Sequence, residues 1–515
     1  MPETAAAVMR DGTVLRADLY RPPHGTGPWP VLLARGPYGR RDPGILARLA
    51  PGAAARRGFL TVVQDVRGRF GSEGEWEPLV HEQDDGYDTV RWAAGLPGSD
   101  GRVAMYGPSY LGHTQWAAMA AAPPELVAAV PEFTWRDPYD GLVARGGAAE
   151  YGLTAQWTLG LGREVLRRRA GGGELARALE ELAAAEAGLA AGAWDPPVLD
   201  GLPRPGRPGG PPLPAGHTAP GVPTLTVAGW YDAFLQGSLD NHTAARAAGL
   251  PAALIVGPWT HEDRTAREFG PAAGEDRLDG GPSLRDRTLT WLAARLSCAP
   301  HTGPAVLVFV MGADEWRPLS SWPPPATPTA WHLHPGGGLS PLPPAAGAAP
   351  GVFRHDPADP VPTVGGALLL TPAYPAGPLD QRAVEARGDV LVHTGEPLGG
   401  PLEVIGRVGA LLAVAAEGPA DWVVRLCDVA PDGTSRVLTD GVTRTPGPGE
   451  QEVRVDLWST AHVFRPGHRL RVHVTSSSHP RWSAPPGPAG SRTVLRARIT
   501  LPVRRRGRSG APPAA

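Results

Sequence analysis

Residues 105–112, which read Met-Tyr-Gly-Pro-Ser-Tyr-Leu-Gly, constrain the fold of this chain more than any other stretch. The apolar run 102–106 predicts a buried strand, and the run 111–122 after the turn predicts a helix. Ser109 therefore lies on a sharp corner between a strand and a helix. On such a corner the serine hydroxyl points outward and the next N–H points the same way. A nucleophilic serine needs this arrangement, because it requires a base and an oxyanion donor beside it.

A serine on a corner of this kind is more often structural, and G-x-S-x-x-G departs from the common G-x-S-x-G spacing. A nucleophile also needs an acid and a histidine, which follow it in that order in such folds. Asp232 comes just after the strand-like run 223–229, and His261 comes just after the strand-like run 252–257. Open α/β sheets build their sites at these carboxyl ends of strands. Either residue alone would be an ordinary loop residue, but together with Ser109 they predict a catalytic triad.

The predicted elements divide the chain into parts. Residues 1–140 and 220–320 alternate strands and helices, which predicts a mostly parallel sheet covered on both faces. Residues 141–219 lose the strand pattern and are rich in alanine, leucine, arginine and glutamate, so a helical insertion is expected there. Short alternating runs over 325–503 predict an antiparallel sandwich of the jelly-roll type. The arginine-, glycine- and proline-rich end, 504–515, predicts a disordered tail.

Composition excludes several classes of protein. A chain of 515 residues is too long for one core, and its net charge of −2 gives no reason to expect nucleic acid or an anionic membrane surface as a partner. No apolar run is long enough for a membrane span, and the N-terminus does not resemble a signal peptide. Cys298 and Cys427 have no metal or redox spacing. We expect a cytoplasmic protein without a metal or an organic cofactor, and a homodimer is left open.

Five motifs of this sequence resemble those of a known protein family. They comprise the serine segment 107–116, the acid segment 229–232, the histidine segment 257–261, the glycine-rich loop 65–74 and the segment 355–362. With these motifs the chain resembles, over roughly residues 5–500, the CocE/NonD family of hydrolases. This group includes bacterial cocaine esterase and the X-Pro dipeptidyl-peptidase S15-like serine hydrolases. The resemblance implies an α/β-hydrolase domain with an inserted helical cap, followed by a C-terminal β jelly-roll domain.

The resemblance also implies an oxyanion hole. In this family a tyrosine at the position of Tyr38 donates its hydroxyl to the oxyanion, beside the N–H of the residue after the serine, here Tyr110. A phenol stays protonated at neutral pH and is a good donor to an alkoxide-like oxygen. The glycine-rich loop lacks the Lys-Ser or Lys-Thr of a phosphate-binding loop, so we expect it to shape the edge of the pocket.

The residues after Asp232 narrow the range of substrates that we expect. α-Amino acid ester hydrolases carry acids there that bind the substrate amine, whereas this chain has Ala233, Phe234 and Leu235. A cationic amine would be desolvated there without a partner, which is costly. The sequence looks closer to the cocaine-esterase branch, so we expect a small-molecule ester with an uncharged, often aromatic acyl group. Its expected contacts are Trp230, Phe234 and Trp157.

The sequence therefore predicts a serine carboxylic-ester hydrolase that works through an acyl-enzyme. X-Pro dipeptidyl-peptidase, amidase or acyltransferase activity through the same triad is the main alternative. A non-catalytic binding protein on this scaffold is a further alternative, against which the complete set of Ser109, Asp232, His261 and Tyr38 argues.

Overall fold

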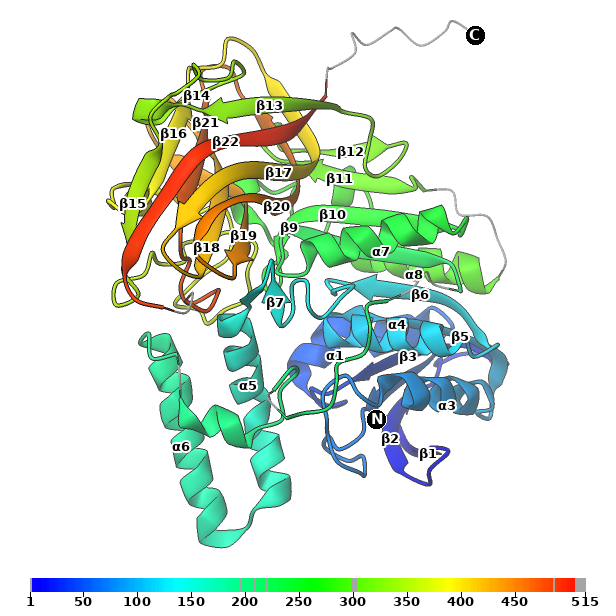
Figure 1. Ribbon diagram of the computed structural model, residues 1–515. Coiled ribbons are helices and arrows are strands. Elements are labelled where there is room, and N and C mark those ends of the chain that lie inside the picture. The colour runs from blue at the N-terminus through cyan, green and yellow to red at the C-terminus, as the bar shows by residue number, and fades with distance from the viewer. Residues whose placement is uncertain are drawn as a thin grey trace, which may run out of the picture.

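A ten-stranded mixed sheet forms the framework of the first part of the computed structural model (Figure 1). The structure describes residues 2–194, 196–207, 209–217, 221–297, 303–484 and 487–504. In chain order the strands of this sheet are β1 (Glu3–Val8), β2 (Val14–Tyr20), β3 (Trp29–Gly36), β4 (Leu60–Asp65), β5 (Ser99–Pro108), β6 (Leu126–Glu132), β9 (Thr224–Tyr231), β10 (Ala252–Thr260), β11 (Val306–Val310) and β12 (Glu315–Leu319).

The spatial order of these strands is β1-β2-β4-β3-β5-β6-β9-β10-β11-β12. Neighbours from β4 to β11 pair in parallel, and the outer pairs β1–β2, β2–β4 and β11–β12 are antiparallel. The carboxyl ends of the parallel strands therefore meet along one edge of the sheet. That edge receives the loops that carry Tyr38, Ser109, Asp232 and His261.

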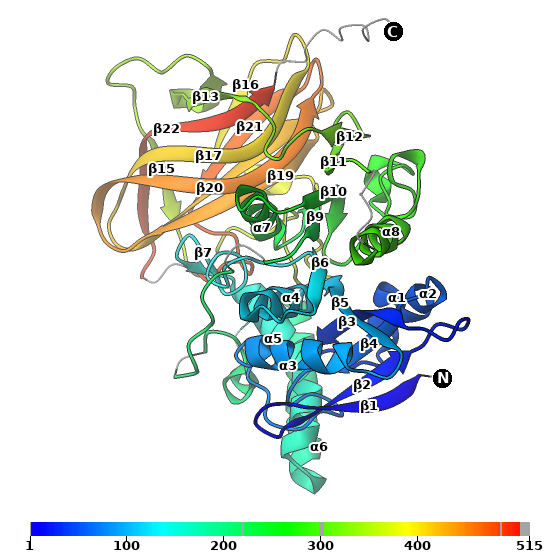
Figure 2. The same ribbon diagram turned by 90° about the vertical axis from the view of Figure 1, so that its right-hand side faces the viewer.

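Helices cover both faces of this sheet, as Figure 2 shows. They are α1 (Pro43–Leu49), α2 (Pro51–Arg56) and α8 (Leu284–Leu296) on one face, and α3 (Glu82–Ala94), α4 (Tyr110–Ala121) and α7 (Leu235–Ala247) on the other. Strand β3 shows why both faces are apolar. Leu32 and Ala34 pack with Leu49 and Leu292 in one cluster, while Val31 and Leu33 pack in a second cluster on the opposite face.

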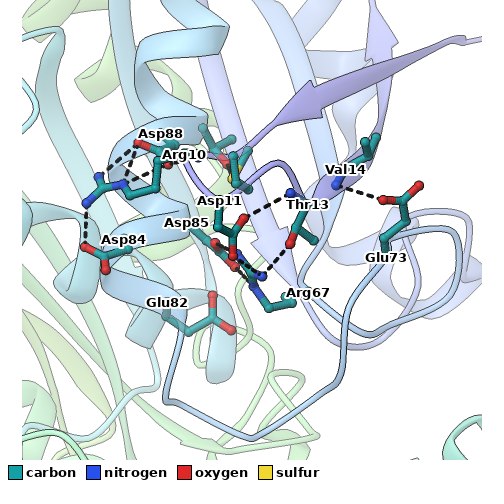
Figure 3. Close-up of polar contacts among 12 residues, drawn as sticks. Arg10, Asp11, Thr13, Val14, Arg67, Glu73, Glu82, Asp84, Asp85 and Asp88 are labelled. Carbon is teal, nitrogen blue, oxygen red and sulfur yellow. Dashed lines mark hydrogen bonds and ion pairs between the residues drawn. The ribbon is translucent and has the colours of Figure 1, made fainter.

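Contacts across the N-terminal edge tie three segments together (Figure 3). Arg10 pairs with Asp84 and Asp88 on α3, each at 2.9 Å. Arg67, from the glycine-rich loop, pairs with Asp85 at 2.6 Å and Asp11 at 2.7 Å. The β1–β2 hairpin, the glycine-rich loop and the start of α3 are thus held as one unit.

The expected helical insertion consists mainly of two long helices, α5 (Tyr151–Arg169) and α6 (Gly172–Ala190), followed by the short helix η1 (Pro197–Gly201). Figure 1 shows α5 and α6 side by side, running away from the sheet. A two-stranded hairpin, β7 (Ala144–Arg145) and β8 (Ala148–Ala149), precedes α5 and was not expected. Apolar residues of α5 and α6 share a buried cluster with Trp76 and Leu79, which follow β4, so the helices lie over the loops at the sheet edge.

The C-terminal part is a β-sandwich (Figure 1). Its strands are β13 (Thr327–Leu333), β14 (Gly338–Ser340), β15 (Gly351–His355), β16 (Leu391–Gly395), β17 (Leu402–Ala416), β18 (Ala420–Val429), β19 (Ser435–Thr445), β20 (Gly449–Phe464), β21 (Arg469–Thr475) and β22 (Gly490–Arg504). The hydrogen-bonded order runs β19-β18-β21-β16-β14-β13-β22-β17-β20, with β15 beside β22. Because β19 and β20 also contact each other, the sheet folds back on itself around an apolar core.

This architecture confirms the expected α/β-hydrolase fold with a C-terminal β domain. One boundary needs correction, because Arg504 is the last residue of β22 and pairs with Glu403 at 3.3 Å. The rest of the expected tail, residues 505–515, lies outside the described residues.

Candidate active site

Ser109 occupies a strained corner between β5 and α4. Its φ is +61° and its ψ −124°, a positive-φ conformation that costs free energy for any residue with a side chain. Two glycines make the corner possible. A Cβ on Gly107 would lie 2.9 Å from Leu111 Cβ, and one on Gly112 would lie 2.7 Å from Thr134 Cβ. The second glycine, which comes three residues after the serine, therefore allows α4 to pack tightly against the segment that follows β6.

Asp232 and His261 meet at the carboxyl ends of β9 and β10. His261 Nδ1 lies 2.6 Å from Asp232 Oδ1, and both side chains are buried. The second carboxylate oxygen of Asp232 accepts a hydrogen bond from the Phe234 N–H at 3.1 Å. The aromatic rings of Phe133 and Phe234 stand edge-on to the imidazole, with centroids at 6.1 Å and 5.3 Å. Bonding on one side and packing on the others fix the orientation of the ring.

A salt bridge also holds the segment that carries His261. Arg48 of α1 donates to the carbonyl of His261 at 3.3 Å and pairs with Glu262 at 2.6 Å. Because α1 follows the Tyr38 loop, this contact connects the histidine loop with the segment that carries Tyr38.

Tyr38 lies after β3, beside Ser109. Burial raises the pKa of its hydroxyl, and hydrogen bonds from Trp157, Ser109 and the backbone N–H of Tyr110 oppose this rise. Trp157 Nε1 donates to the Tyr38 oxygen at 3.3 Å. Since the indole N–H occupies the phenol oxygen as an acceptor, the phenol proton remains available for donation. A phenol with a raised pKa keeps this proton throughout the neutral range.

The glycine-rich loop joins the Tyr38 segment to the cap. The buried guanidinium of Arg69 donates to the Pro37 carbonyl at 2.9 Å and pairs with Glu164 of α5 at 3.0 Å. Its guanidinium also lies 4.5 Å from the ring centroid of Trp76. The expectation of a loop that shapes the edge of the pocket agrees with these contacts.

A small enclosed pocket opens beside Ser109. Its lining is Tyr38, Leu79, Ser109, Tyr110, Trp135, Leu142, Leu153, Trp157, Pro205, Phe234 and Leu369. None of these described residues carries a charge. Two of the three residues expected to contact substrate, Phe234 and Trp157, are thus at the pocket.

Trp230, the third expected contact residue, is absent from this lining. Its side chain is 1% exposed, and its Nε1 donates to the Phe309 carbonyl on β11 at 2.7 Å. Its ring packs against Trp322 at 5.7 Å. Successive side chains of a strand point to opposite faces, so a position near Asp232 in sequence does not place Trp230 at the site. The expectation for Trp230 was wrong, and this residue belongs to the core.

Sequence reasoning missed several lining residues. Trp135 follows β6, and Leu142 and Leu153 flank the β7–β8 hairpin. Leu369 comes from the C-terminal part of the chain, between β15 and β16. The sequence signal for Leu369 was weak: it belongs to a run of leucines, 368–370, outside any predicted strand. Such a run suggests burial, but nothing in the local sequence indicates which distant surface it will cover.

The described residues contain one group with donor atoms close enough for a metal ion, formed by Glu385, Cys427 and His473 in the β-sandwich. These groups already bind protein partners. Glu385 pairs with Arg471 at 2.5 Å and contacts His473 Nε2 at 3.0 Å. Burial raises the pKa of the Cys427 thiol, which disfavours the thiolate that a metal would need. Across the described ranges, no helix is both long enough and apolar enough to span a bilayer.

Comparison with known proteins identifies the family. The model described as X-Pro dipeptidyl-peptidase (S15 family) matches residues 11–263, and that of the X-Pro dipeptidyl-peptidase C-terminal non-catalytic domain matches residues 301–505. A cocaine esterase from Rhodococcus sp. (strain MB1 Bresler) is 34% identical over 535 residues, covering 92% of this chain and 90% of the relative. The chain belongs to the CocE/NonD hydrolases of the S15 family. The expected resemblance is confirmed.

Solved structures agree over nearly the whole chain. An aminopeptidase from the marine sediment archaeon Thaumarchaeota archaeon has a TM-score of 0.74 at 25% identity, covering 97% of this chain and 96% of that one. An α-amino acid ester hydrolase has a TM-score of 0.73 at 25% identity, covering 98% and 96%. Family membership places the protein among the serine hydrolases.

Proposed function

We propose that this protein is a serine carboxylic-ester hydrolase with Ser109, His261 and Asp232 as its catalytic triad. The observation that carries the proposal is the 2.6 Å contact between His261 Nδ1 and Asp232 Oδ1, formed at the same sheet edge as the strained Ser109. A histidine held at Nδ1 by a buried carboxylate presents Nε2 as the proton acceptor. The 34% identity to a cocaine esterase and the match to the S15 family support the same chemistry.

The reaction follows from the roles of these groups. Ser109 Oγ attacks the acyl carbon while His261 accepts its proton, and the alcohol leaves with that proton from His261. Asp232 stabilises the imidazolium that forms between these steps. Water then attacks the acyl-enzyme with His261 again as the base. The negative oxygen of each tetrahedral intermediate accepts hydrogen bonds from the Tyr38 hydroxyl and the Tyr110 N–H.

We further propose that the acyl group is uncharged and aromatic. The pocket beside Ser109 is lined by aromatic and aliphatic side chains, among them Trp135, Trp157 and Phe234. An ammonium group in this pocket would lose its hydration without gaining a carboxylate, which is strongly unfavourable. A flat aromatic acyl group would instead bury its faces against these rings.

A peptidase is the second candidate, because the family model that matches residues 11–263 carries the description X-Pro dipeptidyl-peptidase. Cleavage of an N-terminal dipeptide requires a site for a free α-amine. The two candidates are separated by the hydrolysis rates of p-nitrophenyl benzoate, alanine p-nitrophenyl ester and Ala-Pro-p-nitroanilide. We expect the benzoate to have the highest kcat/KM. A higher kcat/KM for either amine-bearing substrate would contradict the proposed acyl specificity.

Two neighbouring leucines give a matched test of the pocket. Leu369 lines the pocket, whereas Leu368 is buried in the adjoining apolar cluster and is absent from the lining. Leu369→Ala should lower kcat/KM for p-nitrophenyl benzoate about tenfold and change that for the acetate little, since lost apolar contact costs about 1–3 kcal/mol. Leu368→Ala should affect stability without this discrimination. Equal losses for both esters in Leu369→Ala would show that the aromatic group does not occupy this pocket.

A further inference from the structure

The side chain of Tyr110 is anchored at its hydroxyl in the protein interior. Tyr110 is the first residue of α4 and is 1% exposed. Its hydroxyl donates to Glu82 Oε1 at 2.9 Å and accepts from the Leu79 N–H at 2.8 Å. Its ring stacks on Trp157 with an interplanar angle of 15°. The residue that follows Ser109 is thus held at both its ring and its hydroxyl.

Glu82 is a buried carboxylate with a compensating charge. It is 3% exposed, and its Oε2 lies 3.2 Å from the guanidinium of Arg35, which is fully buried. Glu82 also begins α3, where the positive end of the helix dipole favours an anion. Figure 3 shows that Arg10 and Arg67 bond the other acids in the first two turns of α3, Asp84, Asp85 and Asp88, and not Glu82. Among the described residues, the side chains of Arg35 and Tyr110 are thus the ones that contact the Glu82 carboxylate directly.

Arg35 extends the network to the Tyr38 side of the site. It lies near the end of β3, three residues before Tyr38, and its Nε donates to Gln64 Oε1 at 2.7 Å. Its carbonyl accepts from Thr114 Oγ1 of α4 at 3.2 Å. One buried ion pair thus joins β3, which leads to Tyr38, with the first turn of α4, which carries the Tyr110 N–H.

We propose that Glu82 is a positioning residue for the oxyanion hole, acting through the Tyr110 hydroxyl and Arg35 to fix the two donors relative to Ser109. This inference rests on the proposed function, because it requires the Tyr110 N–H and the Tyr38 hydroxyl to bind the oxyanion. The contacts of the ring and hydroxyl restrain the side-chain torsions of Tyr110, and they thereby limit how far its Cα and the adjoining backbone N–H can shift at the helix start. The pairing with Arg35 also neutralises a carboxylate that would otherwise repel the oxyanion.

Tyr110→Phe tests the inference with the least disturbance, because it keeps the ring that lines the pocket and removes only the hydroxyl, with its bonds to Glu82 and to the Leu79 N–H. We expect kcat for p-nitrophenyl benzoate to fall about 10- to 100-fold, because small misplacements of catalytic donors have effects of that order. KM should stay within about twofold, since the donor meets its charge only in the transition state. Affinity for phenylboronic acid, which forms a tetrahedral adduct with a nucleophilic serine, should fall by a factor similar to that of kcat.

Tyr106→Phe is the matched control. Tyr106 is a buried tyrosine of β5 whose hydroxyl makes one hydrogen bond, to the Leu49 carbonyl at 3.1 Å. It should lower the thermal midpoint as Tyr110→Phe does but leave kcat within twofold of the wild type. An unchanged kcat in Tyr110→Phe, a change in KM alone, or an equal loss of kcat in Tyr106→Phe would overturn the inference.

Two further variants complete the test. Glu82→Gln retains an acceptor for Tyr110 but removes the charge, so we expect a smaller loss of kcat than in Tyr110→Phe. A larger loss in soluble, folded Glu82→Gln would mean that Tyr110 does not transmit the effect. If Glu82→Gln does not fold because Arg35 is left uncompensated, Tyr110→Phe and Tyr106→Phe still decide the matter. Ser109→Ala distinguishes a failure of this inference from a failure of the proposed function, because full turnover in this variant would refute the proposed function itself.

Discussion

Substitution of Tyr38 by phenylalanine removes one hydroxyl and keeps the aromatic ring. In the wild type Trp157 Nε1 donates to the phenol oxygen at 3.3 Å, so the phenol proton is free to bind the oxyanion. Loss of one oxyanion donor typically lowers kcat by about 10²–10³, or about 2.7–4 kcal/mol in the barrier. We expect a loss within this range for Tyr38→Phe, with KM little changed because the ring remains in the pocket.

The pH dependence of this loss adds a second check. Burial raises the pKa of the Tyr38 hydroxyl, so the wild type keeps its phenol proton as pH rises through 8. The ratio of wild-type to variant kcat should therefore be constant between pH 6 and pH 8.5. The assay is steady-state hydrolysis of p-nitrophenyl benzoate, with Tyr106→Phe as the control for losing a buried tyrosine hydroxyl. A wild-type kcat in Tyr38→Phe, or an effect on KM alone, would refute the role of this hydroxyl as an oxyanion donor.

Two other predictions concern stability. Gly112→Ala should lower the free energy of unfolding by about 1–3 kcal/mol, because its Cβ would lie 2.7 Å from Thr134 Cβ. Gly160→Ala on α5 is the control, since its Cβ would meet open space, and it should be neutral or stabilising in thermal melts. Equal effects of the two substitutions would contradict the packing argument. Burial lowers the pKa of His242 to about 4, so this histidine stays neutral in the fold but gains a proton on unfolding below pH 6.5. Stability should then fall between pH 6.5 and pH 4, and His242→Gln should recover about 1–2 kcal/mol of the loss seen at pH 5 in denaturant titrations; an unchanged pH slope would exclude this contribution.

The residues of the proposed triad could be predicted because each is tied to the end of its own strand. Ser109, Asp232 and His261 directly follow apolar runs that the parallel sheet aligns along one edge. Their local sequence therefore fixed their common location without knowledge of distant contacts. The same reasoning failed for Trp230, because it used proximity in sequence to Asp232 and ignored the alternation of side chains along β9.

Residues that reach the pocket from distant segments could not be predicted in this way. Leu369 lies in an irregular segment of the C-terminal part, and only the packing of that part against the cap brings it to Ser109. The Glu82–Arg35 ion pair could not be predicted either, because in the sequence Glu82 is one of several acids at the start of a helix. The end of the sandwich was placed one residue too early, because Arg504 begins an arginine- and glycine-rich run that resembles a polar tail, and only its pairing with Glu403 shows that it belongs to β22.

The central claim is that Ser109 is the nucleophile that forms the acyl-enzyme. Treatment with a fluorophosphonate, followed by mass spectrometry of the intact protein and of its peptides, tests this most directly. We expect one phosphonyl adduct per chain, located on the peptide that contains Ser109, together with complete loss of ester hydrolysis. Ser109→Ala should take up no label and lose turnover by up to about a millionfold. An adduct on a different serine, or ester hydrolysis by pure Ser109→Ala within tenfold of the wild type, would contradict the claim.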